Sequence, residues 1–220
     1  MYSLDVDFGF NDSNSIKYKN VNLEFQDGDI INIIGENGCG KSSFYKMLMG
    51  QIRTLRGKVP KSISDNIVVV SDYVKIPGEC NVEDVVALLK ESACDYLKEN
   101  FSIIYEYVMN INKKEVSVLS SGQIRVLEIF CALSTQKKML VLDEASNGLD
   151  IYNRQILIEQ IQILAATNNI VIFSTTHHLE DILEIGGTIL CMNKYKGEIV
   201  KYDGKYDLND ITAFLKESGK

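Results

Sequence analysis

Hydrophobic and polar residues alternate over roughly the first 34 positions, interrupted by the polar segments NDSNS (11–15) and QDGD (26–29). Alternation with a period of two, broken by such turn-forming segments, is typical of paired antiparallel strands. The run IINII (30–34) does not alternate, as expected for a strand that is buried on both faces. The pattern therefore predicts a small antiparallel sheet, roughly residues 2–34, that leads into a buried strand.

Three more short apolar runs follow, NIVVV (66–70), MLVL (139–142) and IVIF (170–173), and they indicate buried parallel strands. A helix is predicted at 41–50. Asn81 is expected to cap the helix VEDVVALLK, with Asp84 three residues on in a near capping box. A longer helix is predicted through DYLKENFSIIYEYVM (95–109). The fold class is therefore α/β, a single domain over residues 1–220 with an inserted helical lobe at roughly 80–133.

The composition is that of an ordinary soluble protein of 220 residues, with a net charge of −7 that argues against a general nucleic-acid binder. The opening residues MYSLDVDFGF lack the pattern of a signal peptide, and no apolar run approaches the ~20 residues of a membrane span. The five cysteines form no C-x-x-C pair, which favours reduced thiols in a cytoplasmic protein. Any membrane function is therefore expected to depend on a partner.

The segment GENGCGKSS (35–43) follows the predicted strand 30–34 and opens the predicted helix 41–50. It fits the phosphate-binding loop G-x-x-x-x-G-K-[ST] through Gly35, Gly40, Lys41 and Ser42. Glycines allow the backbone N–H groups to wrap around a phosphate, the lysine adds a positive charge, and the serine hydroxyl suits Mg²⁺. The alternative, a glycine-rich turn with a solvated lysine, does not explain the strand before it and the helix after it.

Two carboxylates, Asp143 and Glu144, end the apolar strand MLVL, where α/β sheets bind their ligands. Beside a phosphate site, one carboxylate is suited to hold Mg²⁺ and the other to polarise an attacking water. An acidic turn without a function is the alternative. A second polar turn, LSSGQ (119–123), begins another predicted helix, and helix N-termini favour anions.

The motifs GENGCGKSS, LSSGQ, LDEASNGLD and STTHH occur in an order and at spacings that resemble those of the ATP-binding-cassette (ABC) ATPases, the nucleotide-binding subunits of ABC transporters. The resemblance covers nearly the whole chain. It implies a P-loop NTPase core of the ABC type with an N-terminal antiparallel β lobe and an inserted α-helical lobe. It also implies ATP and Mg²⁺ as cofactors, and a second ABC ATPase chain, either a copy or a paralogue, with two ATP molecules sandwiched head to tail. The chain would then power an integral membrane transporter subunit, peripherally at the cytoplasmic face of the membrane, and no nucleic acid is expected.

The resemblance also implies roles for individual residues. Lys41, Glu144 and the switch residue His177 are expected to be catalytic, and Ser42 and Asp143 to hold the metal. The expected nucleotide-binding residues are Phe10, Gly35, Glu36, Asn37, Gly38, Cys39, Gly40, Lys41, Ser42, Ser43, Ser120, Ser121, Gly122, Gln123 and Asp150. Phe10 would stack on adenine, with Phe8 and Tyr18 as competing candidates. His178 occupies a position where the family often has aspartate.

The sequence departs from the family pattern at several positions. No glutamine follows the strand 66–70, and Asp72 occupies its slot, either as a metal ligand or as a solvated loop residue. Ser121 replaces a signature glycine, and serine tolerates positive φ poorly. Ala145 replaces a common proline. Val126 fills the slot of a common arginine, and Arg125 precedes it.

The predicted function is that of an active ATP-hydrolysing subunit of a membrane ABC transporter, driven by ATP-dependent dimerisation. Two alternatives stay open. A soluble ABC-type ATPase associated with nucleic acid or the ribosome is disfavoured by the acidic charge and by a length that leaves no room for a second cassette. A degenerate regulatory nucleotide-binding module is suggested by Asp72 and Ser121 but is disfavoured by the presence of Glu144.

Overall fold

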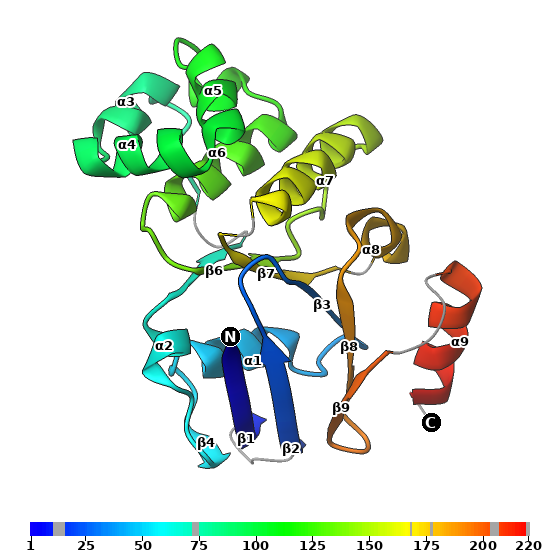
Figure 1. Ribbon diagram of the computed structural model, residues 1–220. Helices are drawn as coiled ribbons and strands as arrows, with labels where there is room; N and C mark the ends of the chain where they lie inside the picture. Colours follow the sequence, from blue (N-terminus) through cyan, green and yellow to red (C-terminus); the bar gives the residue numbers. More distant parts are fainter. Residues whose placement is uncertain (11–15, 72–74, 168, 177, 203–206, 219–220) are drawn as a thin grey trace.

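The chain forms two β-sheets and a separate group of helices (Figure 1). The computed structural model describes residues 1–10, 16–71, 75–167, 169–176, 178–202 and 207–218, with the backbone alone at 10, 16 and 216–218. A three-stranded antiparallel sheet has the order β2-β1-β4, formed by β1 (Tyr2–Phe10), β2 (Ile16–Phe25) and β4 (Thr54–Arg56). The predicted antiparallel lobe is confirmed.

The larger sheet has six strands in the order β5-β6-β7-β3-β8-β9. Its strands are β3 (Ile30–Ile34), β5 (Ile67–Val70), β6 (Met139–Asp143), β7 (Val171–Thr175), β8 (Thr188–Asn193) and β9 (Glu198–Lys201). All neighbours pair in parallel except β8 and β9. The three apolar runs predicted as parallel strands are β5, β6 and β7, so the α/β core is confirmed.

Alternate residues of β6 pack into two different hydrophobic cores, as strand geometry requires. Met139 and Val141 face a core that contains helix α1 (Lys41–Leu48) and the antiparallel sheet. Leu140 and Leu142 face a core built with helix α6 (Ser121–Leu133) and helix α7 (Ile151–Ala166). Because both faces are covered, the strand needs no polar alternation, which explains its continuous apolar sequence.

The other helices complete these layers. They are α2 (Lys61–Ser64), α3 (Val82–Ala87), α4 (Glu91–Asn100), α5 (Ser102–Asn110), the short 3₁₀ helix η1 (Val116–Val118), α8 (Leu179–Ile185) and α9 (Leu208–Ser218). Figure 1 shows α3 to α6 together as a helical group at one end of the molecule. Asn81 caps α3 in the predicted capping box, where its backbone N–H donates to Asp84 Oδ2 at 2.9 Å.

The predicted long helix over 95–109 is wrong, because the structure has two helices, α4 and α5, that break at Phe101. Phe101 leaves helical geometry (φ −138°, ψ 48°) and is 4% exposed, packed edge-on against Tyr96 at 5.9 Å between ring centroids. Burial of the phenylalanine ring stabilises this turn by about 1.5–3 kcal/mol, which outweighs the continuous helical pattern.

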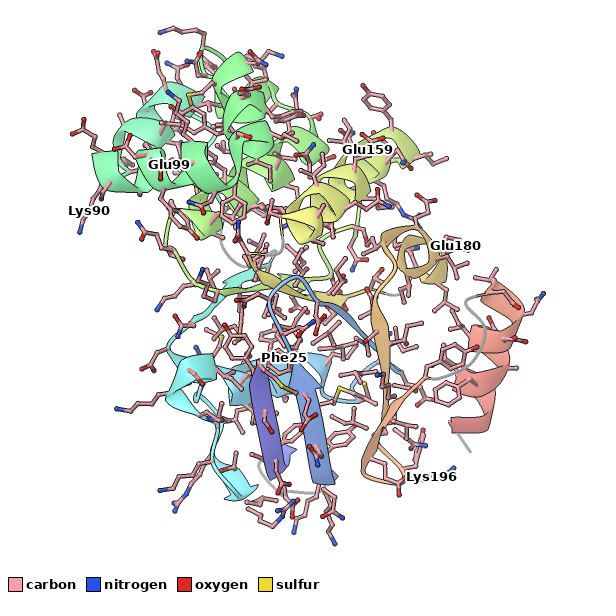
Figure 2. The ribbon with its side chains drawn as sticks, in the orientation of Figure 1. Phe25, Lys90, Glu99, Glu159, Glu180 and Lys196 are labelled. Carbon is pink, nitrogen blue, oxygen red and sulfur yellow. The ribbon has the colours of Figure 1, made fainter. Side chains whose placement is uncertain are left out.

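Aromatic packing joins the two sheets. Phe25 at the end of β2 meets Phe173 of β7 edge to face, with ring centroids 5.4 Å apart, and Figure 2 shows Phe25 in the interior. Such a pair contributes about 0.5–1.5 kcal/mol beyond its buried area. Lys90 and Glu99 lie at the outer edge of the helical group in the same view. No helix within the described part of the chain has the length and apolarity to cross a membrane.

Candidate functional site

The P-loop runs from Gly35 to Gly40, between the end of β3 and the start of α1. Strand and helix surround the glycine-rich segment as the sequence predicts. Lys41, the first residue of α1, is 7% exposed, and its Nζ donates to the carbonyl oxygen of Gly35 at 3.1 Å. The ammonium group is therefore folded back over the loop, where it can meet a bound phosphate.

Gly35 has a backbone that only glycine adopts easily, with φ +152°. A Cβ at this position would lie 2.7 Å from Cys39 Sγ and 2.7 Å from the Met192 carbonyl oxygen. The loop is therefore closed too tightly for any side chain at its first position. Burial raises the pKa of the Cys39 thiol, so this cysteine acts as a packed apolar group rather than as a thiolate.

Glu36 and Asn37 lie on the exposed side of the loop, together with Gly38. Lys194, which follows β8, forms an ion pair with Glu36 at 3.0 Å and donates to the Asn37 carbonyl oxygen at 3.4 Å. The Glu36 carboxylate raises the pKa of Lys194, and Lys194 in turn lowers the pKa of Glu36. This contact could not be predicted from the sequence, because it depends on the position of β8 beside β3.

The Asp143 carboxylate lies at the end of β6, 8% exposed, against the start of α1. Ser42 Oγ is 3.5 Å from Asp143 Oδ2, and the Tyr45 hydroxyl donates to the same oxygen. Thr175 Oγ1, on the paired strand β7, donates to Oδ1 at 2.7 Å. The structure thus brings together Ser42 and Asp143, the predicted metal pair. The described residues hold no cluster of three or more His, Cys, Asp or Glu side chains able to bind a metal.

Glu144 takes a left-handed backbone, with φ 52°. Such a conformation costs about 1–3 kcal/mol at a non-glycine residue unless its surroundings hold it. Two bonds from its N–H do so, one to the Thr175 carbonyl oxygen at 3.1 Å and one to Thr175 Oγ1 at 2.9 Å. Its carboxylate Oε2 accepts from Asn147 Nδ2 at 2.7 Å. The turn therefore directs the carboxylates of Asp143 and Glu144, although the residues are adjacent, to different partners.

The signature LSSGQ forms the N-terminus of α6. Ser120 is the N-cap: its Oγ accepts from the Gln123 N–H at 3.2 Å, and Gln123 Oε1 accepts from the Ser120 N–H at 3.1 Å. This reciprocal capping box fixes the Ser120 side chain and leaves its hydroxyl proton available to donate elsewhere. The arrangement suits an anion at the helix N-terminus.

Ser121 does not take the positive φ that its replacement of a glycine suggested. It is the first residue of α6, and the described residues with positive φ other than glycine are Asn20, Gln136 and Glu144. Serine is therefore compatible with the signature backbone. Glycine is needed at position 122, where a Cβ would lie 2.7 Å from Asn153 Oδ1 and 3.0 Å from the Asn153 carbonyl oxygen.

Asp150, the last residue of the LDEASNGLD motif, caps α7. Its carboxylate accepts from the Asn153 N–H at 2.8 Å and from Asn153 Nδ2 at 2.8 Å, and these bonds hold its pKa below the usual value. Asn153 also packs directly against Gly122, so the LDEASNGLD motif and the signature lie next to each other. The predicted role of Asp150 toward a nucleotide stays a prediction.

Arg125 was identified from the sequence only as a misplaced arginine, but the structure gives it a clear contact. Its Nε donates to the Ala145 carbonyl oxygen at 3.1 Å, and its Nη1 pairs with Glu128 Oε2 at 2.7 Å. The side chain is 8% exposed. Arg125 therefore links α6 to the backbone next to Glu144. The ion pair with Glu128 could have been predicted from the sequence, because residues three apart on a helix are neighbours.

Three predicted site residues lie outside what the structure describes. They are Asp72, His177 and the side chain of Phe10, whose backbone ends β1. The alternatives to Phe10 are core residues, since Phe8 and Tyr18 are fully buried and stacked at 5.1 Å. Tyr18 donates to the Cys39 carbonyl oxygen at 2.6 Å, so it supports the P-loop from beneath. Neither side chain is available to stack on adenine.

A comparison with protein families finds a match that covers the P-loop and the end of β6. The family model described as ABC transporter matches residues 18–147, which is more than half of the chain. The chain belongs to the ABC transporter family. The match includes the P-loop, the signature and the Asp143–Glu144 pair. The P-loop, the signature and the acidic strand end therefore all lie within one matched range.

Curated relatives in the ABC transporter family are ATP-binding proteins. The molybdate import ATP-binding protein MolC of Haemophilus influenzae is 28% identical over 186 residues, which cover 80% of this chain and 73% of the relative. The energy-coupling factor transporter ATP-binding protein EcfA2 of Clostridium perfringens is 30% identical over 211 residues, covering 86% and 73%. The zinc import ATP-binding protein ZnuC of Wolbachia pipientis is 30% identical over 187 residues, covering 79% and 72%.

Solved structures of ABC transporters share the fold. A metal-chelate type ABC transporter in an inward-facing conformation superposes with a TM-score of 0.76 at 25% identity, over 97% of this chain and 88% of that one. A nucleotide-free ATP-binding cassette from an ABC transporter has a TM-score of 0.72 at 20% identity, over 98% and 96%. The predicted fold, an ABC ATPase core with antiparallel and helical lobes, is confirmed.

Proposed function

We propose that this chain hydrolyses ATP as one half of a head-to-tail pair of cassettes and so drives an integral membrane transporter subunit. The chain is an ABC-type ATPase that serves a membrane transporter, as its family and its relatives indicate. The observation that carries the finer proposal is the meeting of α1 and β6, where Ser42 Oγ lies 3.5 Å from Asp143 Oδ2 and the neighbouring Lys41 is folded over the P-loop.

The P-loop residues 35–43 are proposed to bind the phosphates of ATP through backbone N–H groups and the Lys41 ammonium. Ser42 and Asp143 would hold Mg²⁺. Their oxygen atoms, 3.5 Å apart, are of the type that Mg²⁺ prefers, and one carboxylate and one hydroxyl suffice because phosphates and waters complete its shell. The ion would offset the charge on the phosphates. Glu144 is proposed to orient the attacking water and accept its proton. His177 is proposed to contact the γ-phosphate, and Asp72 to approach the metal.

A partner cassette would explain why the chain carries the signature LSSGQ (119–123) in addition to its P-loop. The signature opens α6 in the helical group, while the P-loop opens α1 in the core shared by the two sheets, so the two motifs belong to different parts of the fold (Figure 1). In a two-fold pair, the signature of each chain can face the P-loop of the other, since such contacts are reciprocal. Ser120, Ser121, Gly122 and Gln123 would then bind the neighbour's γ-phosphate, with Asp150 beside them. Mixing two differently tagged inactive variants decides whether the partner is a copy or a paralogue.

The names of the relatives favour import. MolC and ZnuC are named for import of molybdate and of zinc, so we propose an importer as the transport class. The chain would act peripherally at the cytoplasmic face of the membrane. Ser121 no longer supports the alternative of a degenerate regulatory module, because its backbone is compatible with an ordinary helix start.

Membrane association tests the proposal against the soluble alternative. A tagged chain, expressed in its own cell from its own locus, is expected to sediment with membranes and, after detergent extraction, to co-elute with a protein that has several membrane spans. Washing with chelator and high salt should not remove it if the contact is apolar and specific. Recovery of the chain with ribosomes, and none with membranes, would contradict the transporter assignment and favour the alternative.

A further inference from the structure

The Asp143 carboxylate is surrounded by three hydroxyl groups, which come from two elements, α1 and β7. Thr175 Oγ1 of β7 donates to Oδ1 at 2.7 Å, while Ser42 Oγ of α1 lies 3.5 Å from Oδ2. The third is the phenol of Tyr45, which donates to Oδ2. Both carboxylate oxygens are therefore held before any ligand arrives. Thr175 and Ser42 follow from the strand pairing and the P-loop motif, but Tyr45 belongs to neither.

Tyr45 is placed by the geometry of α1. It follows Ser42 by three residues, so the two side chains share a face of the helix. Its side chain is 4% exposed and packs in the core between the two sheets. A phenylalanine would fill the same space, so packing alone does not account for the hydroxyl. A buried tyrosine needs a partner for its hydroxyl, and here that partner is the carboxylate at the proposed metal site.

We infer that Tyr45 is a positioning residue that holds the Asp143 carboxylate toward Ser42, ready to bind Mg²⁺ together with nucleotide. The inference rests on the proposed metal role of Asp143. A carboxylate oxygen accepts more than one hydrogen bond, and Mg²⁺ is often bound through its waters, so the Tyr45 bond need not break. Mutation of a residue that hydrogen-bonds to a metal ligand typically lowers metal affinity or activity by about 10- to 100-fold.

The test is Tyr45→Phe, which removes one oxygen atom and keeps the ring. Binding of a fluorescent ATP analogue is measured while Mg²⁺ is titrated, and again with the metal removed by EDTA. The Mg²⁺ concentration at half-effect should rise about tenfold, in the range typical of such partners. The affinity without metal should stay at the wild-type value, because the P-loop is intact. Hydrolysis at saturating Mg²⁺ should approach the wild-type rate.

Tyr2→Phe is the matched control. The Tyr2 hydroxyl donates to Asp27 Oδ1 at 3.0 Å, at the surface of the antiparallel sheet, so this change removes the same kind of tyrosine–aspartate bond away from the site. Its Mg²⁺ titration should match that of the wild-type chain. If Tyr45→Phe proves too unstable to purify, Tyr45→Met also removes the hydroxyl while its flexible apolar side chain fills the space, and the same shift is expected.

Asp143→Asn separates failure of this inference from failure of the proposed site. If Asp143→Asn raises the Mg²⁺ requirement and Tyr45→Phe does not, Tyr45 only packs and the inference is overturned. A lower Mg²⁺ requirement in Tyr45→Phe would also overturn it, since the phenol would then be competing with the ion. If Asp143→Asn itself leaves the titration unchanged, the metal role of Asp143 is wrong, and the inference falls with it.

Discussion

The Glu144→Gln chain is expected to bind ATP, to lose hydrolysis by about 10²- to 10⁴-fold, and to stay paired with its partner cassette. The amide keeps the shape of the side chain and can still accept from Asn147 Nδ2, which bonds Glu144 Oε2 at 2.7 Å. It cannot take up the proton of an attacking water, and this step typically contributes a rate factor of that size. In the proposed pair, uncleaved ATP would hold the two chains together, so size-exclusion chromatography with Mg-ATP should show a dimer.

Glu159→Gln provides the control for Glu144→Gln. Glu159 is exposed on α7, and Figure 2 shows it on the outside of the molecule, so the same change of charge there should alter neither hydrolysis nor elution volume. A Glu144→Gln chain that hydrolyses ATP at the rate of the control would show that Glu144 is not the catalytic base. A strict monomer with ATP bound, at high protein concentration, would contradict the closed pair of identical chains.

The Lys41→Ala chain is expected to show no measurable hydrolysis and a roughly 10- to 100-fold loss of Mg-ATP affinity. A hydrogen bond to a charged group contributes about 1.5–3 kcal/mol, which corresponds to that loss. Lys41 is 7% exposed, and its Nζ lies over the loop, bonded to the Gly35 carbonyl oxygen, so the charge is held where a phosphate would bind. Isothermal titration with Mg-ATP and a phosphate-release assay measure the two effects.

Lys46→Ala is the matched control, because Lys46 is an exposed lysine on the same helix α1. It should bind and hydrolyse ATP like the wild-type chain. Lys41→Arg keeps the charge but replaces a compact ammonium with a planar guanidinium, so its activity should stay well below wild type. Wild-type hydrolysis by Lys41→Ala would show that the P-loop is not where ATP is cleaved.

The strands and the P-loop were predictable because each carries a local pattern. The continuous apolar residues of β6 follow from burial on both faces, and the glycines around Lys41 follow from the close approach at Gly35. The break at Phe101 was not predictable in this way. Its cause is the burial of one ring among residues distant in sequence, and helical periodicity does not report on that.

The contacts behind the site depend on packing between elements, and this is why the sequence did not reveal them. Tyr45 looks like any aromatic residue on a buried helix face until β6 places Asp143 beside it. Arg125 reaches the backbone at Ala145 only because α6 packs beside the end of β6. The family motif has glycine at the position of Ser121, but the motif does not specify the backbone angle there. The structure places Ser121 at the start of α6, where no positive φ is needed.

The central claim is that each ATP is cleaved between the P-loop of one chain and the signature of another. Mixing two inactive variants tests it directly. Lys41→Ala removes the ammonium group of the P-loop lysine and so inactivates the P-loop. Ser121→Glu places a carboxylate where the neighbour's γ-phosphate would lie, while Ser121 is exposed and the Ser120 cap of α6 is untouched. An acidic residue in the first turn also favours the helix, so the fold should hold. Ser121→Ala, which adds no charge, should stay active.

Each variant alone is expected to be inactive, and phosphate release should peak near equal amounts of the two. Half of randomly paired dimers are then mixed, and each carries one intact site, so the peak should be about a quarter of the wild-type rate. Differently tagged chains report whether mixed dimers form. If none form, the natural partner is a paralogous cassette. If mixed dimers form and phosphate release stays at zero at every ratio, the result would contradict cleavage between one chain's P-loop and the other's signature.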